Sequence, residues 1–128
     1  MDALKPFLVA GATMLVLDVV WLTVRASYHQ ALFQSVQGSP LTMRLLPAIG
    51  VYLLLPVIVV LSAVRGAKST ADAARRGALT GALLYGFYDL TNYATLKGWT
   101  ATMALTDTAW GATVCAVGAA TTYAFTRA

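Results

Sequence analysis

The chain has 128 residues, of which 59% are hydrophobic and only 11% are charged. Soluble domains carry about 25% charged residues, so this composition excludes a soluble enzyme domain, a disordered tail and a disulfide-stapled secreted module. The net charge of +4 comes from basic residues spread along the chain, which argues against a nucleic-acid partner. We therefore expect one integral membrane domain, residues 1–128, with membrane lipids as its surroundings.

Four stretches are long and apolar enough to cross a bilayer, which takes about 20 mostly apolar residues per helix. They are residues 6–24, 45–64, 77–96 and 101–125. The second stretch contains no charged residue, and each of the others contains one aspartate: Asp18, Asp89 and Asp107. The pattern predicts an all-α, polytopic membrane protein folded as a bundle of four transmembrane helices.

The longest connection, residues 26–44, has a helical pattern in its first half. Apolar side chains recur there at helical spacing, at Tyr28, Leu32, Phe33 and Val36. Residues 38–40 then form a Gly-Ser-Pro sequence that is typical of a helix end. We predict a short amphipathic helix that lies at the membrane interface after the first span. We expect His29 in this helix to face solvent or lipid headgroups.

Small residues recur every four positions in two of the predicted helices, which allows close approach of neighbouring backbones. These two ridges are Ala73, Gly77 and Gly81, and Gly111, Cys115 and Ala119. In the second span, Pro56 is expected to bend the helix and to free a backbone carbonyl near Tyr52.

The distribution of basic residues predicts the orientation, because cytoplasmic loops are enriched in Lys and Arg. With four spans, the side that holds both termini carries Lys5, Arg65, Lys68, Arg75, Arg76 and Arg127. The opposite side carries only Arg25, Arg44 and Lys97. We therefore expect a multi-pass protein with both termini in the cytoplasm.

The three intramembrane aspartates are predicted to share one depth. At 1.5 Å per residue, Asp18 and Asp89 lie roughly 18 Å from the cytoplasmic boundary, and Asp107 lies roughly 20 Å from it. Such a side chain costs about 2.5–3.5 kcal/mol at a helix centre and usually faces the bundle interior. The pattern predicts a polar site in the outer half of the bilayer.

Polar and aromatic side chains share helix faces with these acids. The pattern Asp-x-x-Trp occurs twice, and each copy is expected to pair a carboxylate with an indole N–H one turn away. The predicted ligand-binding residues are Asp18, Trp21, Arg25, Tyr85, Tyr88, Asp89, Asn92, Tyr93, Lys97, Asp107 and Trp110. For any single aspartate, hydrogen bonding between helices is an equally good interpretation, with the Trp and Tyr residues as an interfacial belt.

Several kinds of chemistry lack the residues that they need. Cys115 and His29 are the only Cys and His, so one chain offers no zinc cluster, iron–sulfur site or paired-His haem site. We expect neither a metal nor another cofactor. No Gly-rich phosphate loop is present, which excludes ATP-driven transport by this chain alone.

Two motifs resemble those of a known family. Residues 85–99 contain Tyr-Asp-Leu-Thr-Asn-Tyr, and Asp-Thr-Ala-Trp-Gly follows from Asp107. They look like the signature of small four-helix bacterial membrane proteins catalogued as a domain of unknown function. Residues 18–22, with Tyr28 downstream, are similar to that family's N-terminal motif. The resemblance covers essentially the whole chain and implies a bacterial inner (plasma) membrane location, but no established activity.

Three functions remain open from the sequence. The first is binding or translocation of a small polar or amphiphilic ligand at the aspartate layer, with or without linkage to protons. The second is an accessory subunit of a larger membrane complex, or a homo-oligomer, in which the polar layer joins helices. The third is a membrane-embedded enzyme, or its subunit, that modifies lipid or fatty-acyl chains with paired carboxyl groups as acid and base. We place the binding function first.

Overall fold

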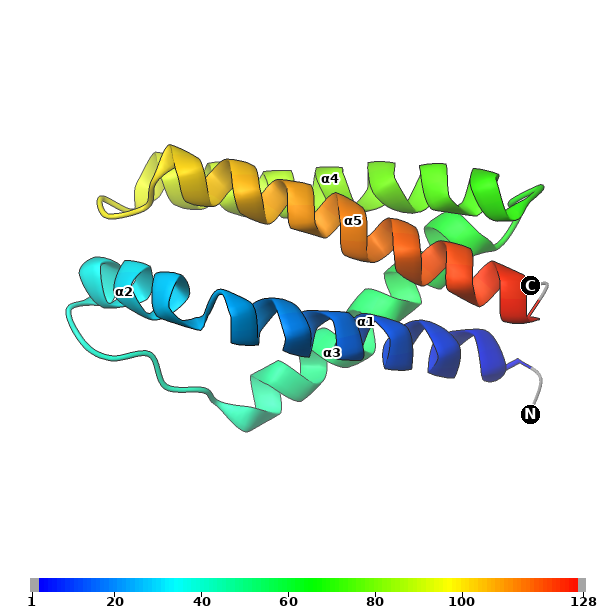
Figure 1. Cartoon of the computed structure of the whole chain (residues 1–128), viewed down its shortest axis with the longest axis horizontal. Coiled ribbons are helices and arrows are strands. Elements are labelled where there is room, and N and C mark those ends of the chain that lie inside the picture. The colour runs from blue at the N-terminus through cyan, green and yellow to red at the C-terminus, as the bar shows by residue number, and fades with distance from the viewer. Residues whose placement is uncertain (1–2, 127–128) are drawn as a thin grey trace.

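The computed structural model describes residues 3–126, and these residues form helices without any strand. Along the chain the helices are α1 (Lys5–Val24), α2 (Ala26–Gln37), α3 (Leu45–Val59), a π-helical turn (Val60–Val64), α4 (Thr70–Thr95) and α5 (Ala101–Thr126). Figure 1 shows α4 and α5 as an antiparallel pair, with α1 beside α5 and α3 running obliquely across the molecule. The predicted all-α class is confirmed. Arg127, which was counted for the orientation, lies outside the described residues.

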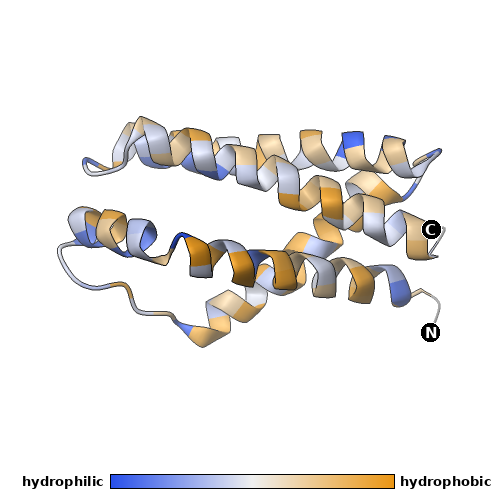
Figure 2. Ribbon diagram, in the orientation of Figure 1, coloured by the Kyte–Doolittle hydropathy of each residue, from blue (hydrophilic) through white to orange (hydrophobic). Residues whose placement is uncertain are grey.

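Two helical stretches among residues 3–126 are long and apolar enough to cross a membrane: α1 and the continuous segment Leu45–Val64. Figure 2 shows strongly apolar residues along α1 and much of α3. α1 begins with Pro6 in its first turn, where the missing N–H leaves no hydrogen bond unmade. Its large apolar side chains mostly point outward, as with Val16, which is 63% exposed. An apolar outer surface of this kind suits hydrocarbon better than water.

The third and fourth predicted stretches also form helices. α4 and α5 each contain 26 residues, which corresponds to a length of about 39 Å. They do not reach the hydropathy of α1, because Asp, Asn, Thr and Tyr side chains are interspersed among their apolar residues. Length is therefore sufficient for spanning in all four stretches, whereas apolarity alone identifies two.

The two ridges of small residues bring α4 and α5 into backbone contact. A Cβ atom added to Gly81 would collide with the carbonyl oxygen of Gly111, and one added to Gly77 would collide with that of Cys115. Ala73 and Ala119 extend the contact and are fully buried. The predicted packing of these ridges is confirmed, and it makes α4 and α5 the most closely packed pair of helices in the fold.

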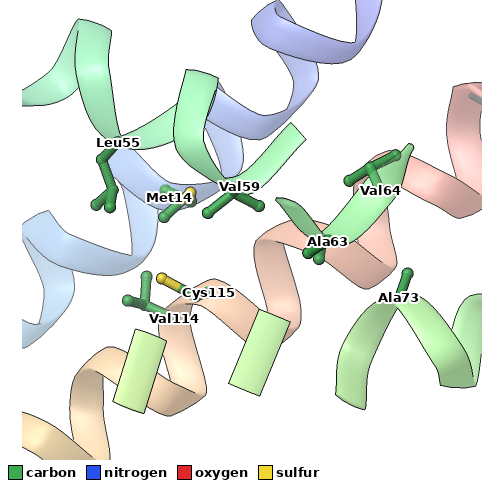
Figure 3. Close-up of a cluster of buried hydrophobic side chains, with 9 residues drawn as sticks. Met14, Leu55, Val59, Ala63, Val64, Ala73, Val114 and Cys115 are labelled. Carbon is green, nitrogen blue, oxygen red and sulfur yellow. The ribbon is translucent and has the colours of Figure 1, made fainter. Parts of the chain in front are cut away.

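A buried apolar cluster fills the centre of the molecule. Met14 of α1, Val59 of α3, and Val114 and Cys115 of α5 are all nearly or fully inaccessible, and Figure 3 shows them converging from three helices. Pro56 is also buried in α3, and a Cβ on Gly11 of α1 would lie in ordinary contact with its ring. The predicted intrahelical proline is thus part of the α1–α3 contact.

The predicted amphipathic helix is present as α2, but its buried face is occupied by protein. Arg25 has non-helical backbone angles, φ −100° and ψ 11°, and therefore separates α1 from α2. Figure 1 shows α2 continuing along the long axis of the molecule beyond α1. Its Leu32 packs with Trp99 and Met103 from the start of α5 and the turn before it. His29 is only 7% exposed, so the expectation that it faces solvent or headgroups is wrong.

The connection from the π-helical turn to α4 carries the basic cluster. Ser69 caps α4 by accepting a hydrogen bond from the Asp72 backbone N–H at 3.0 Å. The backbone N–H of Lys68 and the guanidinium of Arg75 both bond the Asp72 carboxylate and hold its pKa below the usual value. Two neighbouring cations thereby contact one carboxylate, since Arg76 Nε also lies 3.2 Å from it.

The close approach of α4 and α5 predicts a large effect of one added methyl group. Gly81→Ala should destabilise the protein by about 1–3 kcal/mol, because the methyl group would overlap the Gly111 carbonyl. Gly50→Ala in α3 is the matched control, since a Cβ there meets no atom within 4 Å. Thermal unfolding in a mild detergent would measure both variants. Equal transition midpoints for the two would contradict this packing.

Candidate functional site

The Asp18 carboxylate is the point at which three helices meet. Its Oδ2 accepts a hydrogen bond from the Tyr52 hydroxyl at 2.9 Å, and its Oδ1 accepts one from Trp110 Nε1 at 2.8 Å. Asp18 lies on α1, Tyr52 on α3 and Trp110 on α5. Both oxygens of a half-buried carboxylate are therefore used to join helices that are distant in the sequence.

Aromatic rings form the next layer around this carboxylate. The rings of Trp21 and Trp110 stack with centroids 4.6 Å apart and an interplanar angle of 4°. The guanidinium of Arg25 lies over Tyr28 at 4.3 Å and over Trp21 at 5.2 Å, and it donates to the Thr106 hydroxyl at 3.3 Å. Arg25 is thus held by rings and a hydroxyl, and forms no ion pair within residues 3–126.

A cavity of about 220 Å³ opens beside these residues, at the end of the molecule that lies away from the start of α1 and the end of α5. All five helices and the connection after α2 contribute to its wall. Its lining consists of Asp18, Trp21, Leu22, His29, Phe33, Leu41, Tyr52, Tyr88, Met103, Asp107 and Trp110. Five of these side chains are aromatic rings and two are carboxyl groups, so the space suits a small ligand with both polar and apolar parts.

Behind the cavity, Asp89 of α4 is fully buried. Its nearest polar neighbours are the carboxyl group of Asp107 and the indole of Trp99. Neither oxygen of Asp89 forms a hydrogen bond of good geometry within residues 3–126. A buried carboxyl group without such bonds is costly, and Asp107 connects it to the cavity wall.

Further polar atoms near the cavity lack partners. Trp21 Nε1, Arg25 Nε and His29 Nε2 are buried and form no hydrogen bond with any described residue. Burial, and then the charge of Arg25, lower the pKa of His29 below its usual value, so this imidazole is neutral at pH 7. Buried polar atoms normally have partners, and their concentration at this end of the molecule marks it as a candidate binding site.

The comparison with protein families decides the family. The model of the family described as "Predicted membrane protein (DUF2177)" matches residues 3–124. The chain belongs to this family. Its members are predicted membrane proteins of unknown function, as the motifs at Tyr85 and Asp107 imply. No curated protein and no solved structure has significant similarity to the chain.

In this DUF2177 protein, most of the predicted site residues gather at one place. Asp18, Trp21, Tyr88, Asp107 and Trp110 line the cavity, while Arg25 and Asp89 lie directly behind its wall. The ring of Tyr85 packs on Gly111, and Asn92 lies next to Tyr88. By contrast, Tyr93 is 50% exposed, Lys97 is also exposed, and neither lines the cavity.

The predicted pairing within each Asp-x-x-Trp motif needs correction. Trp110 donates to Asp18 of the other motif, whereas the indole nitrogen of Trp21 has no partner among the described residues. α1 and α5 run antiparallel (Figure 1), so the two motifs face each other and stack their indoles. The register between the helices, and not the spacing within one helix, determines the pairing.

Sequence reasoning missed Tyr52 and His29 as site residues. The sequence does contain a signal for Tyr52. Its hydroxyl group interrupts an otherwise apolar run, four residues before Pro56. His29 follows Arg25 by one helical turn and Trp21 by two, which places it on their side of the chain. Both residues line the cavity.

The role of Tyr52 in joining α3 to α1 predicts a specific loss of stability. In this DUF2177 protein, Tyr52→Phe removes the hydrogen bond to Asp18 and should cost about 1–3 kcal/mol. Tyr93→Phe is the matched control, since that side chain is half exposed. Denaturation in detergent, followed by circular dichroism, provides the measurement. A loss of equal size in both variants would count against the Asp18 junction.

Proposed function

We propose that the protein crosses the inner (plasma) membrane of a bacterium four times, through α1, the segment Leu45–Val64, α4 and α5. α4 and α5 have sufficient length. α5 contacts both apolar stretches, and α4 contacts the end of the segment Leu45–Val64. α4 also has an exposed apolar stripe at helical spacing, formed by Leu79, Leu83, Phe87 and Leu90. These features support spans whose outer faces contact lipid while their polar residues face inward.

The orientation that we propose has both termini in the cytoplasm. The start of α1, the end of α5 and the connection between α3 and α4 lie at one end of the molecule (Figure 1). That connection contains Arg65 and Lys68, and the first turns of α4 add Arg75 and Arg76. The positive-inside rule favours the cytoplasm for such a basic cluster. In this orientation the cavity lies toward the outer surface of the membrane.

The cavity is then a site for a small polar or amphiphilic ligand in the outer half of the bilayer. The observation that carries this proposal is the composition of the cavity wall. Aromatic rings from five helices surround about 220 Å³ of space, together with buried polar atoms that have no partner among the described residues. In hydrocarbon, unpartnered polar atoms are especially costly. A bound molecule that hydrogen-bonds to them offsets this cost.

The packing on the cytoplasmic side of the cavity favours binding over open passage. One helical turn from Asp18 lies Met14, and one turn from Trp110 lies Val114, both buried in the central cluster. This cluster closes the route from the cavity toward the termini. Translocation would require these side chains to move, and Asp107, which links the cavity to Asp89, would then be a natural point for coupling to protons.

The proposed topology predicts the labelling of single cysteines. In a Cys115→Ala background, which removes the sole cysteine, Lys68→Cys should resist a membrane-impermeant maleimide in intact cells and react after lysis. Lys97→Cys should react in intact cells, because it lies in the turn at the opposite end of the molecule. The reverse pattern would show the opposite orientation, and labelling of both in intact cells would rule out the single span, α4, that the proposal places between them.

The proposed site predicts that a bound molecule is lost when the cavity is filled. Native mass spectrometry of the purified protein should detect a retained amphiphile, and Leu22→Trp should reduce its occupancy about tenfold, because the indole takes up cavity space. Leu83→Trp is the matched control, since Leu83 is exposed and lines no cavity. Absence of any retained amphiphile from the wild type, together with no response to added amphiphiles, would refute the binding function.

A further inference from the structure

The charges that line the cavity are unbalanced. Asp18 and Asp107 contribute two carboxyl groups to the wall, and no Lys or Arg of residues 3–126 lines it. Arg25 lies behind the wall and adds one positive charge there, but it stacks on two rings and forms no ion pair with either carboxyl group. His29 does line the cavity, yet its lowered pKa keeps it neutral at pH 7. Within residues 3–126 both ion pairs belong to Asp72, so neither cavity carboxyl group has a cationic partner.

The walls add a second property that attracts a cation. The stacked indoles of Trp21 and Trp110, together with the rings of Phe33, Tyr52 and Tyr88, line the same space. Aromatic faces stabilise a positive charge by about 0.5–2 kcal/mol, and most strongly where water is excluded. Rings combined with uncompensated carboxyl groups are the arrangement by which proteins hold ammonium groups.

His29 shows which kind of ammonium group fits. This side chain is 7% exposed and lines the cavity, and its Nε2 has no hydrogen-bond partner among the described residues. A neutral imidazole can present one ring nitrogen as an acceptor. A primary ammonium has N–H groups to donate to it, whereas a trimethylammonium has none.

The surface next to the cavity adds an apolar extension. A groove of about 680 Å³ runs between α1 and α3, and its lining is apolar except for Tyr52. Tyr52 lines both this groove and the cavity. From Asp18 to Leu4, at the far end of the groove, α1 covers about 21 Å. An acyl chain attached to a group in the cavity would therefore have a continuous apolar surface along which to lie.

We infer that the ligand is a primary-amine amphiphile, whose ammonium group lies between Asp107, Asp18 and His29 and whose acyl chain follows the groove between α1 and α3. This inference rests on the proposed binding function and names the ligand class for the same site. Asp107 lines the cavity beside Asp89 and forms no ion pair within residues 3–126, while Asp18 is already held by Tyr52 and Trp110. Asp107 is therefore the principal counter-ion.

The test uses the full-length protein in nanodiscs of phosphatidylglycerol, a lipid without an amine. A long-chain alkylamine is compared with the alcohol and the trimethylammonium of the same chain length, and with ethylamine. Tryptophan fluorescence reports binding, because two of the three tryptophans line the cavity. The wild type should bind the long-chain amine at least about tenfold more tightly than the alcohol.

The variants assign this preference to the site. Asp107→Asn keeps the shape of the side chain and should abolish the preference for the amine, whereas Asp72→Asn, which removes the same charge outside the cavity, should keep it. His29→Phe preserves an aromatic ring and should remove the preference for the primary amine over the trimethylammonium. This second variant tests the inference independently should Asp107→Asn fail to fold.

Each contrary result has a distinct meaning. Equal affinity for amine and alcohol in the wild type would overturn the inference and leave the proposed amphiphile site intact. A preference that survives in both Asp107→Asn and His29→Phe would also overturn it, because the preference would then arise from the lipid surface. Ethylamine binding as tightly as the long-chain amine would overturn the role of the groove. No binding of any probe would remove the proposed function itself.

Discussion

Asp18 accepts hydrogen bonds from Tyr52 and Trp110, and through them one carboxylate joins α1, α3 and α5. The neighbouring features depend on this junction. The bond to Trp110 holds its indole where Trp21 can stack on it, and the bond to Tyr52 holds the oblique α3 against α1 beside both the cavity and the apolar groove. Without the hydrogen bond from Tyr52 to Asp18, no polar contact among the described residues would join α3 to the other helices at this level of the molecule.

The two ends of the bundle are built on different physical principles. Toward the termini, Gly77 and Gly81 let backbones touch, and small or branched apolar residues such as Val59 fill the remaining space. Toward the other end, aromatic rings pack on one another, as Trp21 does on Trp110, and α2 packs its Leu32 on Trp99. The cavity lies at this end, and five of its lining residues are Trp, Tyr or Phe.

Much of the fold is predictable from local patterns. Long apolar runs indicated the helices, and the spacing of Gly77, Gly81 and Gly111 indicated their closest contact. The partners of individual polar groups were not predictable, because the register between α1 and α5 decides that Trp110 bonds Asp18. The burial of His29 was likewise hidden, since the pattern of an amphipathic helix does not reveal whether lipid, water or protein covers its face.

The tight pairing of α4 with α5 bears on how the chain enters a bilayer. α4 carries Asp89, which α5 and the preceding turn cover with Asp107 and Trp99. In the proposed four-span topology, a lone α4 would expose this carboxyl group to lipid during biogenesis, and the hydropathy of α4 is too low to compensate fully. Because only the short turn between Thr95 and Ala101 separates the helices, they can leave the insertion machinery as one hairpin, with the acid already enclosed.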